Sequence, residues 1–411
     1  SVRMANLGFQ IIEATRSASQ SSAAHGFRSF LTTLGVIIGV ASVIGVVSVV
    51  QGFSASITQE FDGMGTNVIN IESYTPRKAS LQGLYATLGY DDLIEIKHRV
   101  KGISNVTPTV TIWGSNAVIS YRGESTDTMV IGTASTYQKL YAVYPDAGRF
   151  FNLSDDKSRR RVAVLGPSIL TKVNIKGDPI GQYISISGEW FKIIGIAEKR
   201  GKLFGFDQDD FILLPYSTTR ALLGGAEEPD ISIGLQVDDM QMIEQIKQQL
   251  KNVLRRNHNL GKDAADDFKI ATADQMLETF NQIIGSTTLV LAGIVGISVL
   301  VGGIGIMNIM LVSVTERTRE IGIQKALGAT RFDILLQFLI EAVFLCLLGG
   351  LIGLVLGFGA GSLISSATGL PEATVPLWAV FLAFGFSAGT GLIFGIVPAF
   401  KAANLDPIDA L

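Results

Sequence analysis

The chain has little of what catalytic and redox sites are built from. Its 411 residues include three histidines and one cysteine, Cys346, so no intrachain disulfide can form. The histidines are scattered among polar segments without metal-ligand spacing, and no HExxH pattern occurs: His25, His98 and His258. We therefore expect no metal and no cofactor in this chain, and we expect Cys346, which lies inside an apolar run, to be a packing residue.

A nucleotide-binding loop is missing too. The Gly-Lys pairs that begin at Gly201 and Gly261 are followed by Leu and Asp, and the upstream glycine of GxxxxGK[ST] is absent. Work driven by ATP would then need a second subunit that binds ATP and Mg, and this chain is not expected to be an enzyme. A net charge of −3 gives no reason to expect a nucleic-acid partner.

Charge of either sign is scarce. Only 17% of the residues are charged, 47% are hydrophobic, and the mean hydropathy is +0.38, which indicates a membrane protein in contact with lipid. The 45 glycines against 11 prolines favour transmembrane helices packed through small residues over a loop-rich soluble fold.

Four segments are long and apolar enough to cross a bilayer, which takes about 20 residues. They are residues 29–52, 281–314, 334–364 and 375–400. The second belongs to a charge-free stretch that would be about 52 Å long as a helix, well beyond a hydrocarbon core of about 30 Å. Part of it should stand outside the membrane, and we place a stalk at residues 272–284.

Lysine and arginine set the orientation. Residues 1–28 and the loop 315–333 carry cationic side chains, whereas the loop 365–374 carries none. The positive-inside rule then places both termini, including the tail 401–411, in the cytoplasm. Residues 53–280 must form a domain on the other side of the membrane.

The N-terminal segment has apolar residues at helical spacing. Met4, Leu7, Ile11 and Ile12 recur on one face, so we expect residues 1–28 to form an interfacial helix on the inner leaflet. Three residues precede Met4, and we expect Met4 to be the native start of a free-standing polypeptide.

The extracytoplasmic region repeats one order of elements. TNVINIES, DDLIEIKHRV and TPTVTIW predict strand, helix and strand, and ISIGLQV, MIEQIKQQLKNVLRR and DFKIAT predict the same order again. These two parts cover residues 60–120 and 228–272. A strand-rich stretch lies between them at 125–224, with a hairpin whose turn we place at Gly188 and Glu189. We therefore expect an α+β domain: a split βαβ module with an inserted β-rich module.

The loop 315–333 concentrates the charge that its flanks avoid. Glu316 can pair with Arg319 and Arg317 with Glu320 at helical spacing, which predicts a short amphipathic helix. On another face Ile323 and Leu327 lie one turn apart, Gly328 is a helix stop, and Thr330 or Asp333 would open the next helix. A solvated connector that only fixes topology remains the alternative.

Two motifs in the spans suggest chemistry but have simpler explanations. GFSAG, Gly385 to Gly389, matches the GxSxG pattern of serine nucleophiles, yet no histidine occurs in any span to act as a base. Spacing of i, i+4 instead predicts helix packing. The glycines concerned are Gly35, Gly39, Gly349, Gly353, Gly357, Gly385 and Gly389. Glu341, at the cytoplasmic edge of a span, could take part in proton coupling or could simply meet water or a nearby arginine.

GIMNIMLVSVTERTREIGIQKALGATRFDILLQFLIEA closely resembles the signature of the MacB-type permeases of the MacB/FtsX family of ABC transporters. RSFLTTLGVIIGVASVIGVV and GIVPAFKAANLDPIDAL extend the resemblance to all four spans and the tail. MacB proper carries its own N-terminal ATPase, which this chain lacks, and Asp409 stands where a Glu is more usual. The external region resembles the family in layout, as a split "porter" module with an inserted "sabre" module.

The resemblance implies a homodimer in the bacterial inner membrane whose charged loop docks on a separate ABC ATP-binding subunit. Closing of the ATPase subunits would then move the stalks and external domains. In this reading Arg317 and Lys325 supply charge to the partner and Gly328 ends the docking helix. The docking residues carried over are Glu316, Arg317, Arg319, Glu320, Gly322, Lys325, Gly328 and Ala329.

Several functions fit such a machine. The first is efflux of periplasmic substrates through a periplasmic adaptor (membrane-fusion protein) and an outer-membrane channel. The second is mechanotransmission, in which the external domain activates a cell-wall hydrolase or a sensor kinase. The third is lipoprotein release, and a receptor without an ATPase remains if the loop is inert. The size and split layout of residues 53–280 favour efflux.

Overall fold

A computed structural model describes residues 26–64, 67–203, 206–225, 227–368 and 375–406. The interfacial helix expected at 1–28 lies almost entirely outside the described residues, as does the second half of the tail. The chain divides into two compact units. We call residues 56–281 the α/β unit and the remainder the helical unit.

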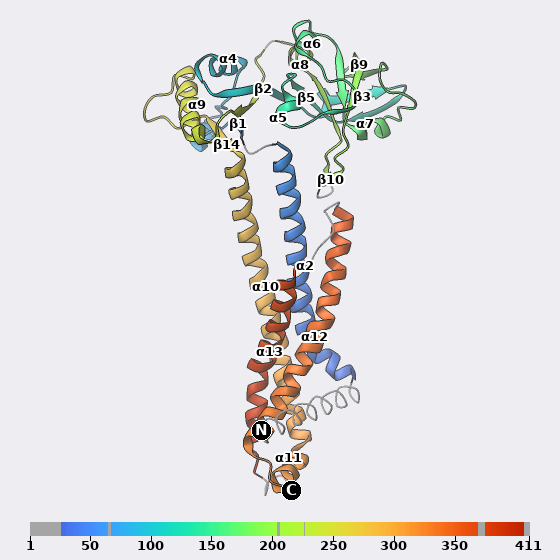
Figure 1. Ribbon diagram of the computed structural model, residues 1–411, viewed down its shortest axis with the longest axis vertical. Helices are drawn as coiled ribbons and strands as arrows, with labels where there is room; N and C mark the ends of the chain where they lie inside the picture. Colours follow the sequence, from blue (N-terminus) through green and yellow to red (C-terminus); the bar gives the residue numbers. More distant parts are fainter. Residues whose placement is uncertain (1–25, 65–66, 204–205, 226, 369–374, 407–411) are drawn as a thin grey trace. The chain divides into compact units, whose positions relative to one another are not determined.

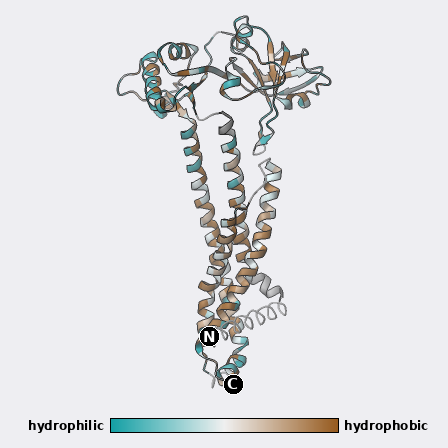
Figure 2. Ribbon diagram, viewed as in Figure 1, coloured by the Kyte–Doolittle hydropathy of each residue, from teal (hydrophilic) through white to brown (hydrophobic). Residues whose placement is uncertain are grey.

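The helical unit contains the four expected spans as helices that are long and apolar enough to cross a membrane. They are α2 (Gly26–Met64), α10 (Ala273–Glu316), α12 (Arg331–Thr368) and α13 (Leu377–Ala403), with the short α11 (Thr318–Ala326) between α10 and α12 (Figure 1). Their central lengths are mostly apolar (Figure 2). The loop after the third span was expected at residues 365–374, but α12 continues to Thr368.

A stalk was expected only on the second span, but α2 and α12 are also far longer than a hydrocarbon core of about 30 Å. α10 has 44 residues and α2 has 39, about 66 and 58 Å at 1.5 Å per residue. The sequence after Val50 contains no proline before Met64, so nothing forces α2 to end where its apolar run ends. The first span therefore continues as helix for about three turns past residue 52.

Glycines on α2 and α12 let these helices approach closely. A Cβ on Gly353 would lie 2.8 Å from the carbonyl oxygen of Ile37, and one on Gly357 would lie 2.7 Å from that of Ala41. Gly349, Gly35 and Gly39 are equally crowded, with nearest atoms at 3.2, 2.2 and 2.7 Å. The Gly35 contact is the backbone of Gly302, which sequence reasoning did not single out. These five positions therefore pack as expected.

Gly385 and Gly389 do not pack closely against the rest of the described chain, contrary to expectation. Apart from the backbone of α13 itself, no atom of the described residues lies within 4 Å of a Cβ built on either residue. α13 packs instead through Gly391 and Gly395, one turn further along, against Val343 and Ala342 of α12. Ser387 lies between Gly385 and Gly389 in the sequence. Its side chain is fully buried and donates to the carbonyl oxygen of Ala383 at 2.8 Å, so it is a packing residue.

One half of the α/β unit is the split βαβ module (Figure 1). Its elements are β1 (Val68–Ser73), α4 (Tyr90–Arg99), β2 (Ile103–Ile112), β13 (Ser232–Val237), α9 (Ile243–Asn257) and β14 (Phe268–Thr272). The strand order is β14-β1-β13-β2 with antiparallel neighbours. α4 and α9 cover this sheet through a shared core that includes Ile96 and Leu250. Two short helices, α3 (Arg77–Leu81) and η2 (Met240–Met242), lie in the connections.

Most strands of the inserted half extend the same sheet, and only β10 and β11 form a separate two-stranded sheet among the described residues. Strand β5 (Met129–Thr133) of the inserted half pairs antiparallel with β2, with Thr133 opposite Thr109, and the order continues β5-β12-β7-β9-β8-β3-β4. The strands are β3 (Val118–Tyr121), β4 (Glu124–Asp127), β6 (Pro145–Gly148), β7 (Val162–Leu165), β8 (Tyr183–Ile186), β9 (Glu189–Ala197), β10 (Lys202–Leu203), β11 (Phe206–Asp207) and β12 (Phe211–Pro215). Short helices connect them: η1 (Gly114–Ala117), α5 (Tyr137–Leu140), α6 (Leu153–Lys157), α7 (Pro167–Lys172) and α8 (Tyr216–Leu222).

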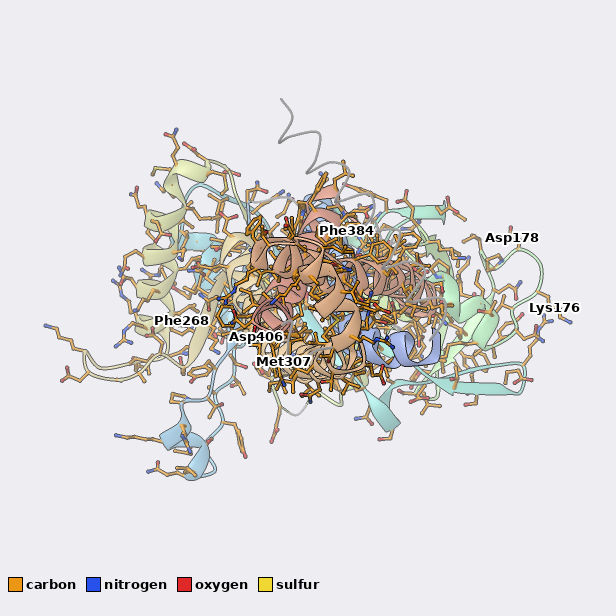
Figure 3. All side chains as sticks on the ribbon, turned by 90° about the horizontal axis from the view of Figure 1, so that it is seen from below. Lys176, Asp178, Phe268, Met307, Phe384 and Asp406 are labelled. Carbon is orange, nitrogen blue, oxygen red and sulfur yellow. The ribbon has the colours of Figure 1, made fainter. Side chains whose placement is uncertain are left out.

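The hairpin predicted in this half forms with its turn displaced by one residue. Ile186 pairs with Glu189, so the two-residue loop is Ser187-Gly188. Both residues have positive φ, 51° and 84°, as the common two-residue hairpin turn requires. The loop that follows α7 stands at the rim of this half, where Lys176 and Asp178 are labelled (Figure 3).

Candidate docking surface around α11

The charged loop folds into a short helix with a defined start and end. Arg317 interrupts the helical run between α10 and α11, and α11 ends at Ala326. Gly328 adopts a φ of +105°, which stops the helix and which a residue with a side chain rarely adopts. The backbone N–H of Thr330 donates to the Asp333 carboxylate at 2.9 Å, and the Asp333 N–H donates to the Thr330 hydroxyl at 3.2 Å. Both residues thus open α12.

Arg317 joins α11 to α12. Its Nη1 lies 3.2 Å from Oε2 of Glu341, and its Nε lies 3.1 Å from Oε2 of Glu320. The guanidinium also sits 5.8 Å from the ring centroid of Phe338. Glu341 is only 9% exposed, so Arg317 supplies the countercharge that a buried carboxylate requires. The nearby arginine considered for Glu341 is therefore present.

Lys325 joins α11 to the end of α13. Its ammonium donates to the carbonyl oxygen of Ala403 at 2.5 Å and also to that of Leu405. These carbonyls close the C-terminal end of a helix, where a cation is favoured. Burial lowers the pKa of Lys325 below its ordinary value, and the positive charge of Arg331 acts in the same direction. Asp406, labelled in Figure 3, follows directly on this segment.

One face of α11 points into the helical unit. Ile321 is 2% exposed and belongs to the core that Phe338 and Ala402 also form. Gly322 is buried beside it, and Ala329 is half-buried against the same core. We call Arg317, Ile321, Gly322 and Lys325 the α11 inner face.

The opposite face of α11 is exposed. Ile323 and Leu327 are 43% and 84% exposed, and the charged Arg319 and Glu320 lie beside them. With Glu316 at the end of α10 these residues follow helical spacing along one stripe. We call Glu316, Arg319, Glu320, Ile323 and Leu327 the α11 outer face. Apolar side chains framed by charge are typical of protein interaction surfaces.

The structure divides six of the eight predicted docking residues between these faces, and Gly328 and Ala329 follow the end of α11. Arg317 and Lys325 were expected to present charge to a partner, and in the structure both bind groups of their own chain. Gly322 is buried, whereas Glu316, Arg319, Glu320 and Gly328 are exposed. Ile323 and Leu327 were not counted as docking residues, although their spacing i, i+4 was visible in the sequence. Within the described segments no group of three or more His, Cys, Asp or Glu could hold a metal ion.

Two family models match the chain. The MacB-like periplasmic core domain matches residues 29–253, and the FtsX-like permease C-terminal model matches residues 292–407. A crystal structure of the periplasmic region of MacB from Actinobacillus actinomycetemcomitans is similar with a TM-score of 0.45 and 20% identity, covering 55% of this chain and 98% of that one.

Three curated relatives align over nearly the whole chain. The macrolide export ATP-binding/permease protein MacB of Bdellovibrio bacteriovorus is 37% identical over 409 residues, covering 98% of this chain and 62% of that protein. The pyoverdine export ATP-binding/permease protein PvdT of Pseudomonas savastanoi pv. phaseolicola is 34% identical, covering 98% and 60%. The uncharacterized ABC transporter permease YknZ of Bacillus subtilis is 36% identical, covering 98% and 99%.

The alignments with MacB and PvdT thus span less than two thirds of those proteins, whereas the alignment with YknZ spans almost the whole of YknZ. Four apolar helices and both family models agree on a multi-pass membrane protein with a MacB-like periplasmic core domain. The chain belongs to the MacB/FtsX family of ABC transporter permeases.

Proposed function

We propose that this chain is the permease of an ABC transporter and that the α11 outer face docks on a separate ATP-binding subunit, which holds ATP and Mg. The observation that carries the proposal is the one-sided attachment of α11. Arg317, Ile321 and Lys325 fix the helix to its own bundle, while Ile323 and Leu327 remain exposed on the other side. A helix held rigidly from behind can pass a force from its outer face to the helices behind it.

Continuous helices provide a route for that force. α10 runs unbroken from Ala273, which follows β14, to Glu316, which precedes Arg317. α2 likewise extends from the helical unit to Met64, shortly before β1. Closing of the ATPase on α11 would therefore be transmitted along α10 to the α/β unit without a nucleotide site in this chain. In this proposal the protein is a homodimer in the inner membrane, with both termini and α11 in the cytoplasm and the α/β unit in the periplasm.

Efflux is the function that we propose for this movement. Two relatives are named for export, of macrolides and of pyoverdine. By analogy this permease would drive substrates from the periplasm through a membrane-fusion adaptor and an outer-membrane channel. Substrate would contact the α/β unit and would not cross a central pore.

Affinity capture tests both parts of the proposal. The chain is solubilised gently from its native membrane with an affinity tag, cross-linked mildly, and its companions are identified by mass spectrometry. An ABC ATP-binding subunit together with a membrane-fusion adaptor is the expected result. An ATPase accompanied by a cell-wall hydrolase would replace efflux with mechanotransmission, and the absence of any ATPase after cross-linking would contradict docking.

A further inference from the structure

A groove of about 440 Å³ opens in the α/β unit where the split βαβ module meets the inserted half. Tyr90 begins α4, Asp156 lies on α6, and Tyr216 and Arg220 lie on α8, beside α6 (Figure 1). Further lining comes from Arg159, Ser217, Ala221 and Gly225. Crevices between two structural halves are common positions for ligand sites.

Two tyrosines form the aromatic wall of this groove. The rings of Tyr90 and Tyr216 stack with centroids 5.0 Å apart at an interplanar angle of 16°. Tyr216 is 4% exposed, and its buried hydroxyl has no hydrogen-bond partner among the described residues. Burial, followed by the negative charge of Glu228, raises the pKa of Tyr216 to about 12, so the hydroxyl keeps its proton and remains a donor.

Native proteins leave few buried hydroxyls without a partner, and each such group calls for an explanation. Tyr90 is only partly buried, and its ring lies on that of Tyr216. Both tyrosines belong to the lining of the groove. A ligand oxygen there would complete the missing hydrogen bond.

The groove carries charge of both signs, with Asp156 as the anion in its lining and Arg159 and Arg220 as the cations. Asp156 accepts hydrogen bonds from the Ser217 backbone N–H at 3.0 Å and from the Ser217 hydroxyl at 2.9 Å. Arg220 pairs with Glu228. Arg159 is exposed, holds a positive φ of 50°, and forms no ion pair with another described residue. A guanidinium of this kind suits a carboxylate, which it can bind through two parallel hydrogen bonds.

We infer that this groove binds small amphiphiles in which a carboxylate adjoins an aromatic body, with Arg159 holding the carboxylate and the Tyr90 and Tyr216 pair holding the aromatic body. An oxygen next to the aromatic body accepts from the Tyr216 hydroxyl. The inference deepens the proposed export function, on which it rests for calling these ligands substrates. Binding itself needs neither ATP nor an ATPase, so it can be tested separately.

N-acetyl-4-benzoylphenylalanine is a suitable probe because it carries a free carboxylate, an amide oxygen and a photoreactive aromatic ketone. The full chain in lipid nanodiscs is irradiated with increasing probe, and the labelled peptides are identified by mass spectrometry. The methyl ester of the same probe is the control ligand, since it keeps the aromatic body and loses the charge. We expect saturable labelling near Tyr90 or Tyr216 by the acid and at least tenfold weaker labelling by the ester.

Two variants, each with a matched control, separate binding from folding. Arg159→Gln should weaken labelling by the acid about tenfold, as expected for loss of a hydrogen bond to a charged group, whereas Arg122→Gln on the β3–β4 turn should not. Tyr216→Phe removes the unpartnered hydroxyl, so the unfolding temperature without probe should stay unchanged or rise while labelling falls several-fold. Tyr121→Phe is the opposite case, because the Tyr121 hydroxyl donates to Gln182 and its loss should lower the unfolding temperature.

The outcomes decide the inference whatever the ATPase does. Preferential acid labelling of the groove that both Arg159→Gln and Tyr216→Phe reduce supports a carboxylate site. Equal labelling by acid and ester, or labelling that neither variant changes, would reduce the groove to a surface that adsorbs aromatic compounds and would overturn the inference. Absence of saturable labelling would overturn it as well, even if affinity capture had found the expected ATPase.

Discussion

The inner and outer faces of α11 use the same kinds of residue for opposite purposes. On the inner face Arg317 and Lys325 are satisfied by Glu341 and by the carbonyls at the end of α13. On the outer face Ile323 and Leu327 are exposed among charged side chains. A charged residue in this loop is therefore no sign in itself that a partner binds it, because its charge can be used within the chain.

The inner face can therefore be tested for its role in holding α11 to the bundle, and the outer face for its role in binding the ATPase. Breaking a contact of the inner face should damage the bundle, whereas changing the outer face should leave the bundle intact and damage docking.

The double variant Ile323→Asp, Leu327→Asp should have the largest effect. Two apolar anchors at the centre of an interface typically carry about 2 kcal/mol or more each, so the affinity for the ATPase should fall by roughly several hundredfold or more. The measurement is ATP hydrolysis by the captured ATPase, reconstituted with wild-type or variant permease. Leu81→Asp is the control, because Leu81 is 81% exposed but lies on α3. Unchanged ATP hydrolysis with the double variant would contradict docking at the α11 outer face.

Arg317→Ala should destabilise the helical unit. It leaves the Glu341 carboxylate buried without its countercharge, which typically costs about 3–5 kcal/mol. Cys346 is fully buried, so its reaction with a fluorogenic maleimide on heating reports unfolding of the bundle. Adding Glu341→Gln removes the stranded charge and should restore most of the lost stability. No rescue in the double variant would mean that the Arg317 side chain acts through its packing alone.

Gly353→Leu should cost less, on the order of 1–3 kcal/mol, because the new side chain meets the backbone of α2 in a filled interior. Gly385→Leu is the matched change at a glycine with open space around it, and helix propensity predicts no loss there. The same Cys346 reaction compares the two variants. Equal destabilisation would show that Gly385 packs against something outside this chain, such as a second copy.

The smallest effect concerns a charged cluster in the α/β unit that, like Arg317 and Lys325, is satisfied within the chain. His258 lies between two carboxylates, 3.0 Å from Asp92 and 2.8 Å from Asp267. Burial alone would lower the pKa of His258. The hydrogen bonds to Asp92 and Asp267 outweigh this effect, so the pKa lies above its ordinary value. Because a raised pKa favours the protonated folded state, this stability is full below about pH 6.5 and is lost as pH rises through the folded pKa.

Thermal unfolding followed by tryptophan fluorescence checks this dependence. Trp113 and Trp190 lie in the α/β unit, and the unfolding temperature should fall as the pH rises from about 6.5 through the folded pKa of His258. His258→Gln should flatten the part of the profile due to this cluster. A variant that keeps the full slope would assign the pH dependence to other groups.

Sequence reasoning recovered what periodicity and composition encode. The four spans, the split βαβ order, the helix stop at Gly328 and the helix start at Thr330 follow from apolar run length, alternation and local backbone preference. It could not tell whether a glycine such as Gly385 faces a neighbour, because spacing of i, i+4 marks one face of a helix without saying what lies opposite. The continuation of α2 past residue 52 was missed because apolarity, and not helix propensity, set the expected boundary.

The roles within α11 show the same limit. Arg317 and Lys325 are indistinguishable from docking cations in the sequence, since their partners, Glu341 and the carbonyls beyond Ala402, are 24 and more residues away. The groove at Tyr216 was not anticipated at all. Its residues come from both halves of the α/β unit and meet only after folding.

Site-specific photocross-linking tests the central claim most directly. p-Benzoylphenylalanine is placed at Leu327 and, as a control of equal exposure, at Leu81, and the chain is irradiated in its native membrane. The account predicts that Leu327 is joined to a polypeptide that carries the nucleotide-binding motifs of an ABC ATPase and that Leu81 is not. An ATPase joined equally from both positions, or from neither, would contradict docking at the α11 outer face.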